Sequence, residues 1–262
     1  MKKAILVVFF SLVLAFGAKA QFVDGTKGLL CMPSAEMEAE GTFMISNNIL
    51  HKEYLPTHGW CYNTFGYAFS ITFWSRLEIA YSLTIFNGKY RPNPSAVDMI
   101  MFNQDRHFAA RFQLMKENEF GWKWMPSIVA GVSDPVTGSG GGNYIGSDVS
   151  QSNGYFNRYY IAAAKHFQTP WGEVAGHLAY QYSQRVDGMP TGPCAAVTWN
   201  PVWLNREDAF VNSFRATLEY DARKLNFGLN VSIFRDHFEF MTMLFGMKHL
   251  MVGARYKLVL KQ

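Results

Sequence analysis

The sequence predicts an all-β protein, a single antiparallel transmembrane β-barrel of about twelve strands that follows a cleaved signal peptide. Three observations support this fold class. Large apolar and small polar residues alternate along stretches of about ten residues, the length that a tilted membrane strand needs. Aromatic residues make up 16% of the chain and charged residues only 17%, where about 25% charged is usual for soluble domains. The chain also begins with an export signal.

The first 20 residues have the layout of a secretory signal peptide. Lys2 and Lys3 precede an apolar run from Ala4 to Phe16, and an Ala-x-Ala sequence ends at Ala20. A basic start, a short apolar core and a small-residue cleavage site are typical of such signals. The run is shorter than the roughly 20 apolar residues of a membrane-spanning helix. A buried N-terminal helix is the alternative, and we expect cleavage after Ala20 instead.

Charge and cysteine content narrow the possible functions. Cleavage after Ala20 leaves 21 basic and 20 acidic residues, which provides no basic surface for nucleic acid. The three cysteines, Cys31, Cys61 and Cys194, are too widely spaced for a metal-binding motif. Cys31 and Cys61 could form a disulfide in an oxidising compartment, or all three could be unrelated small residues.

Alternation with a period of two is the strongest signal in the chain. From Phe65 to Phe73 every odd position is large and apolar, while the even positions from Thr64 to Thr72 are small or polar. Residues 77–85 repeat the pattern after a turn at Ser75, and residues 213–220, 225–233 and 249–258 show it again. Since side chains alternate between the two faces of a strand, each of these strands has one apolar face.

This pattern defines the expected domain organisation. We expect a signal peptide at 1–20, an N-terminal periplasmic or plug-like segment at 21–42 that tucks under or into the barrel, and the outer-membrane barrel at 43–262. The expected strands lie near residues 43–51, 61–74, 76–86, 106–115, 123–132, 158–167, 173–183, 195–202, 211–221, 225–234, 237–246 and 249–258. Of these, the strand at 195–202 has the weakest pattern, because Pro201 interrupts it.

The predicted connections alternate in length through the first half of the chain. Short links at Ser75, Lys116–Gly121 and Thr169–Trp171 alternate with longer ones at Gly88–Gln104, Ser133–Asn157 and Arg185–Cys194. Short periplasmic turns and longer external loops are typical of outer-membrane barrels. An even strand number with both ends in the periplasm fits this order.

A soluble β-sandwich is the main alternative, since its strands also alternate. The barrel is favoured because charged residues share the small polar face and would line a lumen. The candidate lumen-lining residues are Arg76, Glu78, Arg111, Arg215, Glu219, Asp221 and Arg255. The arginines could pair with the three carboxylates across the lumen, with a cluster of Arg215, Glu219 and Asp221. Such pairs would either close and rigidify the barrel or form a constriction that passes a polar solute.

No constellation for catalysis, metal binding or a cofactor is evident. The seven histidines show no ligand spacing, and no glycine-elbow serine is present. The glycine-rich stretch Gly138–Gly142 lacks the downstream lysine of a phosphate-binding loop and is interpreted as a flexible loop. We therefore expect no enzyme, although an outer-membrane hydrolase stays as a third hypothesis.

Several short motifs resemble those of one family of outer-membrane proteins. Near the N-terminus these are Gly28–Ala35 and Glu40–Thr42, and near the C-terminus Thr198–Pro201, Leu218–Asp221 and Asn226–Leu229. Their sequences (GLLCMPSA, EGT, TWNP, LEYD and NFGL) resemble, in order and spacing, the YjbH-like family associated with exopolysaccharide production. Members of that family are commonly larger and carry extra domains. The high aromatic and methionine content suggests a Bacteroidetes-type branch.

The resemblance implies an outer-membrane barrel of a Gram-negative cell that assists export or assembly of an extracellular polysaccharide. Expected partners are outer-membrane lipid, polysaccharide and periplasmic export proteins. A polysaccharide role predicts aromatic rings for sugar stacking in the lumen or outer loops, with Tyr90, Tyr144, Tyr155 and Trp203 as candidates. The alternative function is a small-solute porin or a structural barrel with a closed lumen.

Overall fold

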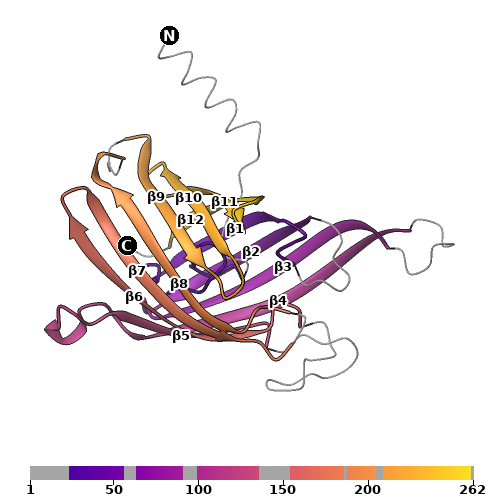
Figure 1. Ribbon diagram of the computed structural model, residues 1–262, viewed down its shortest axis with the longest axis horizontal. Helices are drawn as coiled ribbons and strands as arrows, with labels where there is room; N and C mark the ends of the chain where they lie inside the picture. Colours follow the sequence, from indigo (N-terminus) through magenta and orange to yellow (C-terminus); the bar gives the residue numbers. More distant parts are fainter. Residues whose placement is uncertain are drawn as a thin grey trace, which may run out of the picture.

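The structure is a computed structural model that describes residues 24–55, 63–90, 99–135, 154–185, 188–204 and 209–260. Twelve antiparallel strands form a closed barrel in which each strand pairs with its neighbours in the chain and β1 pairs with β12 (Figure 1). The strands are β1 (Thr42–Leu50), β2 (Thr64–Phe73), β3 (Leu77–Tyr90), β4 (Met99–Met115), β5 (Ser127–Ser133), β6 (Arg158–Thr169), β7 (Gly172–Tyr182), β8 (Gly192–Pro201), β9 (Val211–Tyr220), β10 (Leu225–Ile233), β11 (Phe238–Phe245) and β12 (His249–Val259).

This architecture confirms the predicted all-β barrel of twelve strands. The main difference is the stretch Gly88–Gln104, which was predicted to be a long loop. Instead β3 and β4 continue to the pair Tyr90 and Met99, and this hairpin projects beyond the other strands (Figure 1). Because the projecting part is held by its own ladder of backbone hydrogen bonds, it does not need the alternation that marks a strand in the barrel wall. The predicted signal peptide, Cys61 and Tyr144 lie outside the described residues.

The pleat of the strands puts the small polar face inside the barrel. In β2 the even residues from Thr64 to Thr72 are buried, whereas Phe65, Tyr67 and Phe69 are exposed on the outer surface. None of the helical turns within the described ranges has the length or apolar character to span a membrane.

The two ends of the barrel differ in their connections. At one end, called the terminal end, β1 begins and β12 ends, next to the connections that follow β2, β4, β6, β8 and β10. The opposite end, called the loop end, carries the connections that follow β1, β3, β5, β7, β9 and β11. The two longest connections, after β1 and β5, lie at the loop end.

Residues 24–41, called the luminal segment, lie inside the barrel. Gly28 and Pro33 form an antiparallel bridge, so the segment folds back on itself as a tight hairpin. Side chains of β3, β4, β6 and β9 contact its backbone from different sides of the wall. About eight strands enclose just enough space for their own side chains, so a twelve-stranded barrel has room for an additional segment of chain.

An apolar cluster covers the tip of the luminal segment at the loop end. Leu30 and Cys31 pack there with residues of β1, β11 and β12 and with the connections after β1, β5 and β7. The cluster consists of Leu30, Cys31, Leu50, Tyr54, Leu55, Phe156, Met189, Met241, Met243, Phe245 and Met251. Because unbranched methionine adapts to irregular space, these side chains fit the hairpin tip to the curved wall.

The seam between β8 and β9 is the shortest in the barrel. Only Ala195–Trp199 pair with Ala216–Tyr220, whereas β3 and β4 pair along the whole of β3. Pro201 lacks an N–H group and ends β8, so the weak pattern of the eighth predicted strand corresponds to a short seam. Beyond the last backbone pair, Arg215 donates a side-chain hydrogen bond to Asn200 at 3.2 Å.

The fit of the luminal segment can be tested at Gly25. This residue has a φ of +78°, and an added Cβ would overlap Ala68 and lie 2.9 Å from the Ser82 hydroxyl. We expect Gly25→Ala to displace the segment while the barrel still forms, which a new protease-sensitive site in residues 24–41 would reveal.

Gly121 provides the matched control, since its φ is +76° and an added Cβ would meet nothing within 4 Å. Gly121→Ala carries the same backbone strain, about 1–2 kcal/mol, without the overlap. Equal protease sensitivity in the two variants would contradict the packing argument.

Candidate functional site

The tip of the luminal segment is anchored by one carboxylate of the barrel wall. Glu219 of β9 accepts hydrogen bonds from the backbone N–H groups of Leu30 at 3.0 Å, Cys31 at 2.6 Å and Met32 at 3.5 Å. The side-chain amide of Asn226 donates a fourth at 3.1 Å. Because successive N–H groups in a turn make a concave site for an anion, the tip and Glu219 are complementary.

Three motifs that the sequence analysis singled out meet at this anchor. Gly28–Ala35 forms the hairpin, Leu218–Asp221 supplies Glu219, and Asn226–Leu229 supplies Asn226 and Gly228. A Cβ at Gly228 would lie 2.5 Å from a methyl carbon of Leu30, so only glycine leaves room for the tip. The three motifs, although far apart in the sequence, thus meet at the contact between the segment tip and Glu219.

A second anchor is the fully buried ion pair of Arg111 in β4 and Glu78 in β3, with Nε and Oε2 2.7 Å apart. Arg111 also donates to the carbonyl oxygens of Ser34, at 2.9 Å, and Glu36. Glu78 accepts the backbone N–H of Lys27 at 3.0 Å. The pair therefore satisfies backbone groups on both arms of the hairpin, which have few sheet partners of their own.

Further ion pairs fix the two arms. Arg158 of β6 pairs with Asp24 and donates to the carbonyl oxygen of Cys31 at 3.2 Å. Lys27 contacts Glu38 at 2.6 Å within the segment. Glu38 also contacts Lys257 of β12 at 3.1 Å, so the segment is held to the wall by side chains as well as by backbone groups.

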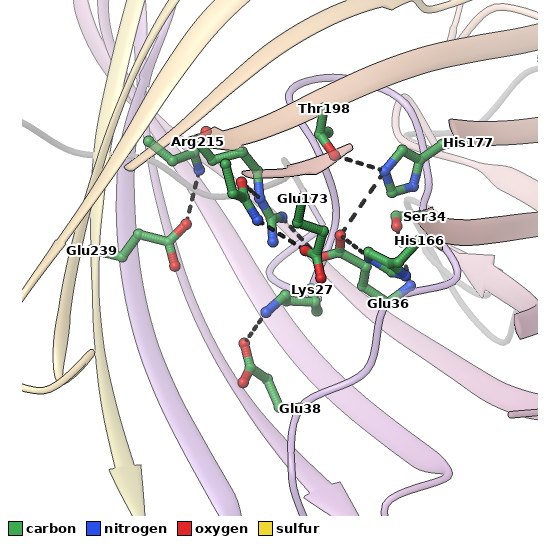
Figure 2. Close-up of polar contacts among 12 residues, drawn as sticks. Lys27, Ser34, Glu36, Glu38, His166, Glu173, His177, Thr198, Arg215 and Glu239 are labelled. Carbon is green, nitrogen blue, oxygen red and sulfur yellow. Dashed lines mark hydrogen bonds and ion pairs between the residues drawn. The ribbon is translucent and has the colours of Figure 1, made fainter. Parts of the chain in front are cut away.

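A polar cleft of about 430 Å³ opens where the segment reaches the terminal end. Figure 2 shows that Lys27, Glu36, Glu38, His166 and Arg215 gather there. The cleft is lined by Lys27, Ala35, Glu36, Met37, Glu38, Ala39, Ser75, Gln113, Lys116, Glu117, Ser127, His166 and Arg215. One side of it is thus the luminal segment, and the others are wall strands and the turns after β2 and β4.

Glu36 is the central group of this cleft. One carboxylate oxygen contacts Arg215 at 2.8 Å, and the other lies 3.6 Å from His166 Nε2 and 4.0 Å from His177 Nε2 (Figure 2). The second oxygen is buried and has no hydrogen bond. Burial alone would raise the pKa of Glu36, but Arg215 and the His166 imidazole hold it well below its usual value. The carboxylate is therefore ionised at neutral pH.

The candidate lumen residues make different contacts from those predicted. Of the predicted pairs between an arginine and a carboxylate of the wall, Arg111 with Glu78 is the one that the described residues form. Arg215 instead binds Glu36, Arg255 binds Glu239, and Asp221 binds Arg223 in the next turn. Glu219 binds backbone amides, so the expected cluster of Arg215, Glu219 and Asp221 is wrong. The luminal segment explains the contacts of Arg215 and Glu219, because it stands between the walls and supplies partners of its own. Arg255 and Asp221 instead pair with close neighbours in the wall and its turn.

Arg76 also differs from its predicted place along the lumen. It precedes β3 at the mouth of the terminal end, where it pairs with Glu119 and donates to the carbonyl oxygen of Gln113. There it ties two neighbouring turns together.

The four aromatic candidates do not form one site. Tyr155 is covered by Arg185, whose guanidinium carbon lies 4.1 Å from the ring centre. Trp203 lies after β8 at the terminal end, away from the loop end, with its ring 5.5 Å from Trp199. Tyr144 and the side chain of Tyr90 are outside the described part. None of the described candidates therefore presents a free aromatic face for sugar stacking at the loop end.

Thiols and metal ligands give no further site. Cys31 and Cys194 are free and buried. In the ranges that the structure describes, no three His, Cys, Asp or Glu side chains are grouped to hold a metal ion.

Sequence reasoning missed Asp24, Glu36, Glu38, Arg158 and His166. Three of them lie on the luminal segment. Arg158 and His166 lie on β6, whose alanine-rich sequence shows little contrast between its faces. The available signal in the segment was the alternation of apolar and acidic residues in 35–40, which read AEMEAE. A segment with few sheet partners that enters a charged lumen needs side-chain partners there.

The second anchor predicts strong coupling between Arg111 and Glu78. Replacing either residue alone with methionine leaves the other charge buried without its partner, which typically costs about 3–5 kcal/mol. We expect the double variant to cost clearly less than the sum of the two single ones in urea unfolding followed by tryptophan fluorescence. Additive costs would show that the two groups act independently.

Comparison with solved structures finds porin chains. Two mutants of the porin of Rh. blastica each align with 12% identity over 84% of this chain and 75% of the porin chain, with a TM-score of 0.30. No protein of curated function matches the chain.

A family model gives the more specific result. The model described as YjbH, exopolysaccharide biosynthesis protein YbjH, matches residues 21–258, which include the luminal segment and almost all of the barrel. It identifies no branch, so the Bacteroidetes-type branch stays a prediction. The resemblance in the short motifs is thereby confirmed at the level of the family, and the chain belongs to the YjbH exopolysaccharide biosynthesis family.

Proposed function

We propose that the protein is an outer-membrane barrel that assists export or assembly of an extracellular polysaccharide, with its luminal segment as a plug. Membership of an exopolysaccharide biosynthesis family supports the polysaccharide role. The apolar outer face of the strands supports insertion into a bilayer, with short connections at the terminal end facing the periplasm and the loop end facing outward. The proposal assigns no catalytic step to the chain.

The main support for the proposal is the set of contacts between the barrel wall and the luminal segment. The wall binds residues 24–41 through carboxyl and guanidinium side chains that face backbone groups, as at Glu219 and Arg111. Such contacts hold a segment firmly, but they can be exchanged for water or another ligand without breaking a sheet. Export through the lumen would thus require the segment to move.

The second candidate function is a structural barrel with a permanently closed lumen that docks partners. The methionine-rich cluster over the segment tip favours it, because leaving the lumen would expose Leu30 and Cys31. A general small-solute porin is less well supported, since the wall charges are engaged by the plug rather than facing an open channel.

Conductance in a planar bilayer separates these possibilities. We expect the refolded wild-type chain to be closed most of the time. Gly228→Leu, whose side chain takes the space of Leu30, should raise the open fraction at least ten-fold. Gly176→Leu is the matched control, because an added Cβ there meets nothing within 4 Å. A closed lumen in every folded variant would favour the structural barrel, and an open wild-type channel would favour a porin.

The role in secretion is measured in cells. A strain that lacks the protein should release several-fold less polysaccharide, scored as extracellular hexose, and the wild-type and Gly176→Leu chains should restore release. Unchanged release in the deletion strain would rule out the proposed role.

A further inference from the structure

The polar cleft at the terminal end is not explained by the holding of the plug. The anchors at Glu219 and at Arg111 and Glu78 lie deeper in the barrel, among fully buried side chains. The cleft, in contrast, opens at the mouth and has about 430 Å³ of space, within the range of about 300–1,000 Å³ that is typical of ligand sites.

Each of the three carboxylates that line the cleft is paired with a cation. Glu38 is paired with Lys27 at 2.6 Å, Glu36 with Arg215 at 2.8 Å, and Glu117 with His166 at 2.6 Å. Lys116 is a fourth cation in the lining. A divalent cation would have to displace one of these partners to bind, and a phosphate would meet three carboxylates around the single additional charge of Lys116. The lining therefore favours a ligand with little or no net charge.

The same lining is rich in hydrogen-bonding groups of both kinds. The ammonium groups of Lys27 and Lys116 can donate, and the carboxylates can accept. The Gln113 amide can do both, and the Ser75 hydroxyl, which already accepts from the backbone N–H of Glu40, can still donate. A ligand with many hydroxyl groups, each a donor and an acceptor, matches this surface.

The floor of the cleft contains a buried carboxylate oxygen without a hydrogen bond. Glu36 is 92% buried, and its oxygen between His166 and His177 makes an ion-pair contact with His166 at 3.6 Å but accepts no hydrogen bond. Since buried polar atoms nearly always have a hydrogen-bond partner, this oxygen points to a water or a ligand hydroxyl that reaches it when the partly exposed His166 shifts.

Aromatic rings stand on the same turns that line the cleft. Trp74 precedes Ser75 after β2, and Phe120, Trp122 and Trp124 follow Lys116 and Glu117 after β4. These four side chains are between 68% and 83% exposed. Aromatic faces present an apolar surface beside polar groups, which is suited to the alternating apolar and hydroxyl faces of sugar rings.

We propose that this cleft, together with the exposed aromatic rings on the turns after β2 and β4, forms a binding site for an uncharged glycan chain at the terminal end of the barrel. The inference rests on the proposed function and names the site at which the polysaccharide first meets the protein. Because Lys27, Glu36 and Glu38 belong to the luminal segment, the glycan would contact the plug itself.

The binding test uses the full chain refolded in lauryldimethylamine oxide, whose head group is not a sugar. The probes are cellohexaose and maltohexaose, which are uncharged, and hexagalacturonate, which is a polyanion. Isothermal titration should show binding of at least one neutral hexasaccharide, and hexagalacturonate should bind at least ten-fold more weakly. Absence of binding by both neutral probes, or tighter binding of the polyanion, would overturn the proposal.

Two tryptophan substitutions locate the site. Ala39 is exposed and lines the cleft, whereas Ala195 is exposed on the outer face of β8. Ala39→Trp should weaken neutral-sugar binding at least ten-fold, and Ala195→Trp should leave it unchanged. Trp124→Ala should weaken it several-fold. Sugar binding that Ala39→Trp leaves intact would place the site elsewhere.

The secretion assay in cells keeps this inference separate from the proposed function. If deletion of the protein lowers polysaccharide release but neutral sugars do not bind, the cleft proposal fails and the secretion role stands. If sugars bind and Ala39→Trp blocks them while deletion leaves release unchanged, the cleft is a glycan site and the secretion role fails.

Discussion

A twelve-stranded wall encloses more space than its inward side chains can fill, and in β2 these side chains are small. The chain fills that space with a segment that has little sheet pairing, so its buried N–H and C=O groups need other partners. Carboxylates of the wall receive the N–H groups, and guanidinium groups reach the carbonyl oxygens. Charged residues inside the barrel and the hairpin at Gly28 and Pro33 both follow from this one requirement.

The same requirement connects the plug with the cleft. The luminal segment leaves the barrel through the terminal end, and there its side chains rather than its backbone groups face the wall. Lys27, Glu36 and Glu38 therefore serve two purposes, as part of the plug and as part of an open polar surface. Any ligand that prefers one arrangement of these residues also shifts the seating of the segment, since the two equilibria share the same groups.

The sequence was informative where a periodic signal existed. Alternation in 63–85 and 213–258 located strands to within a few residues, and the motifs GLLCMPSA, LEYD and NFGL marked the contact of the tip with Glu219 and Gly228. The partners of Arg215 and Arg158 could not be predicted, because the sequence does not set the position of the luminal segment, which carries Glu36 and Asp24, against the wall. The extended β3–β4 hairpin was not predicted either. Its strands pair through backbone groups beyond the barrel wall, and such pairing does not require alternating side chains.

Arg215 contacts both the luminal segment and the neighbouring strand β8. Its guanidinium holds Glu36 of the luminal segment and also reaches Asn200 across the shortest seam of the barrel, just beyond the last backbone pair of β8 and β9. If Glu36 moved away, this partly exposed guanidinium would keep Asn200 of β8 as a hydrogen-bond partner and the carboxylates of Glu173 and Glu239 as neighbouring charges. Because one side chain both holds the luminal segment and bridges β8 and β9, the seating of the segment is linked to the closure of the wall at its shortest seam.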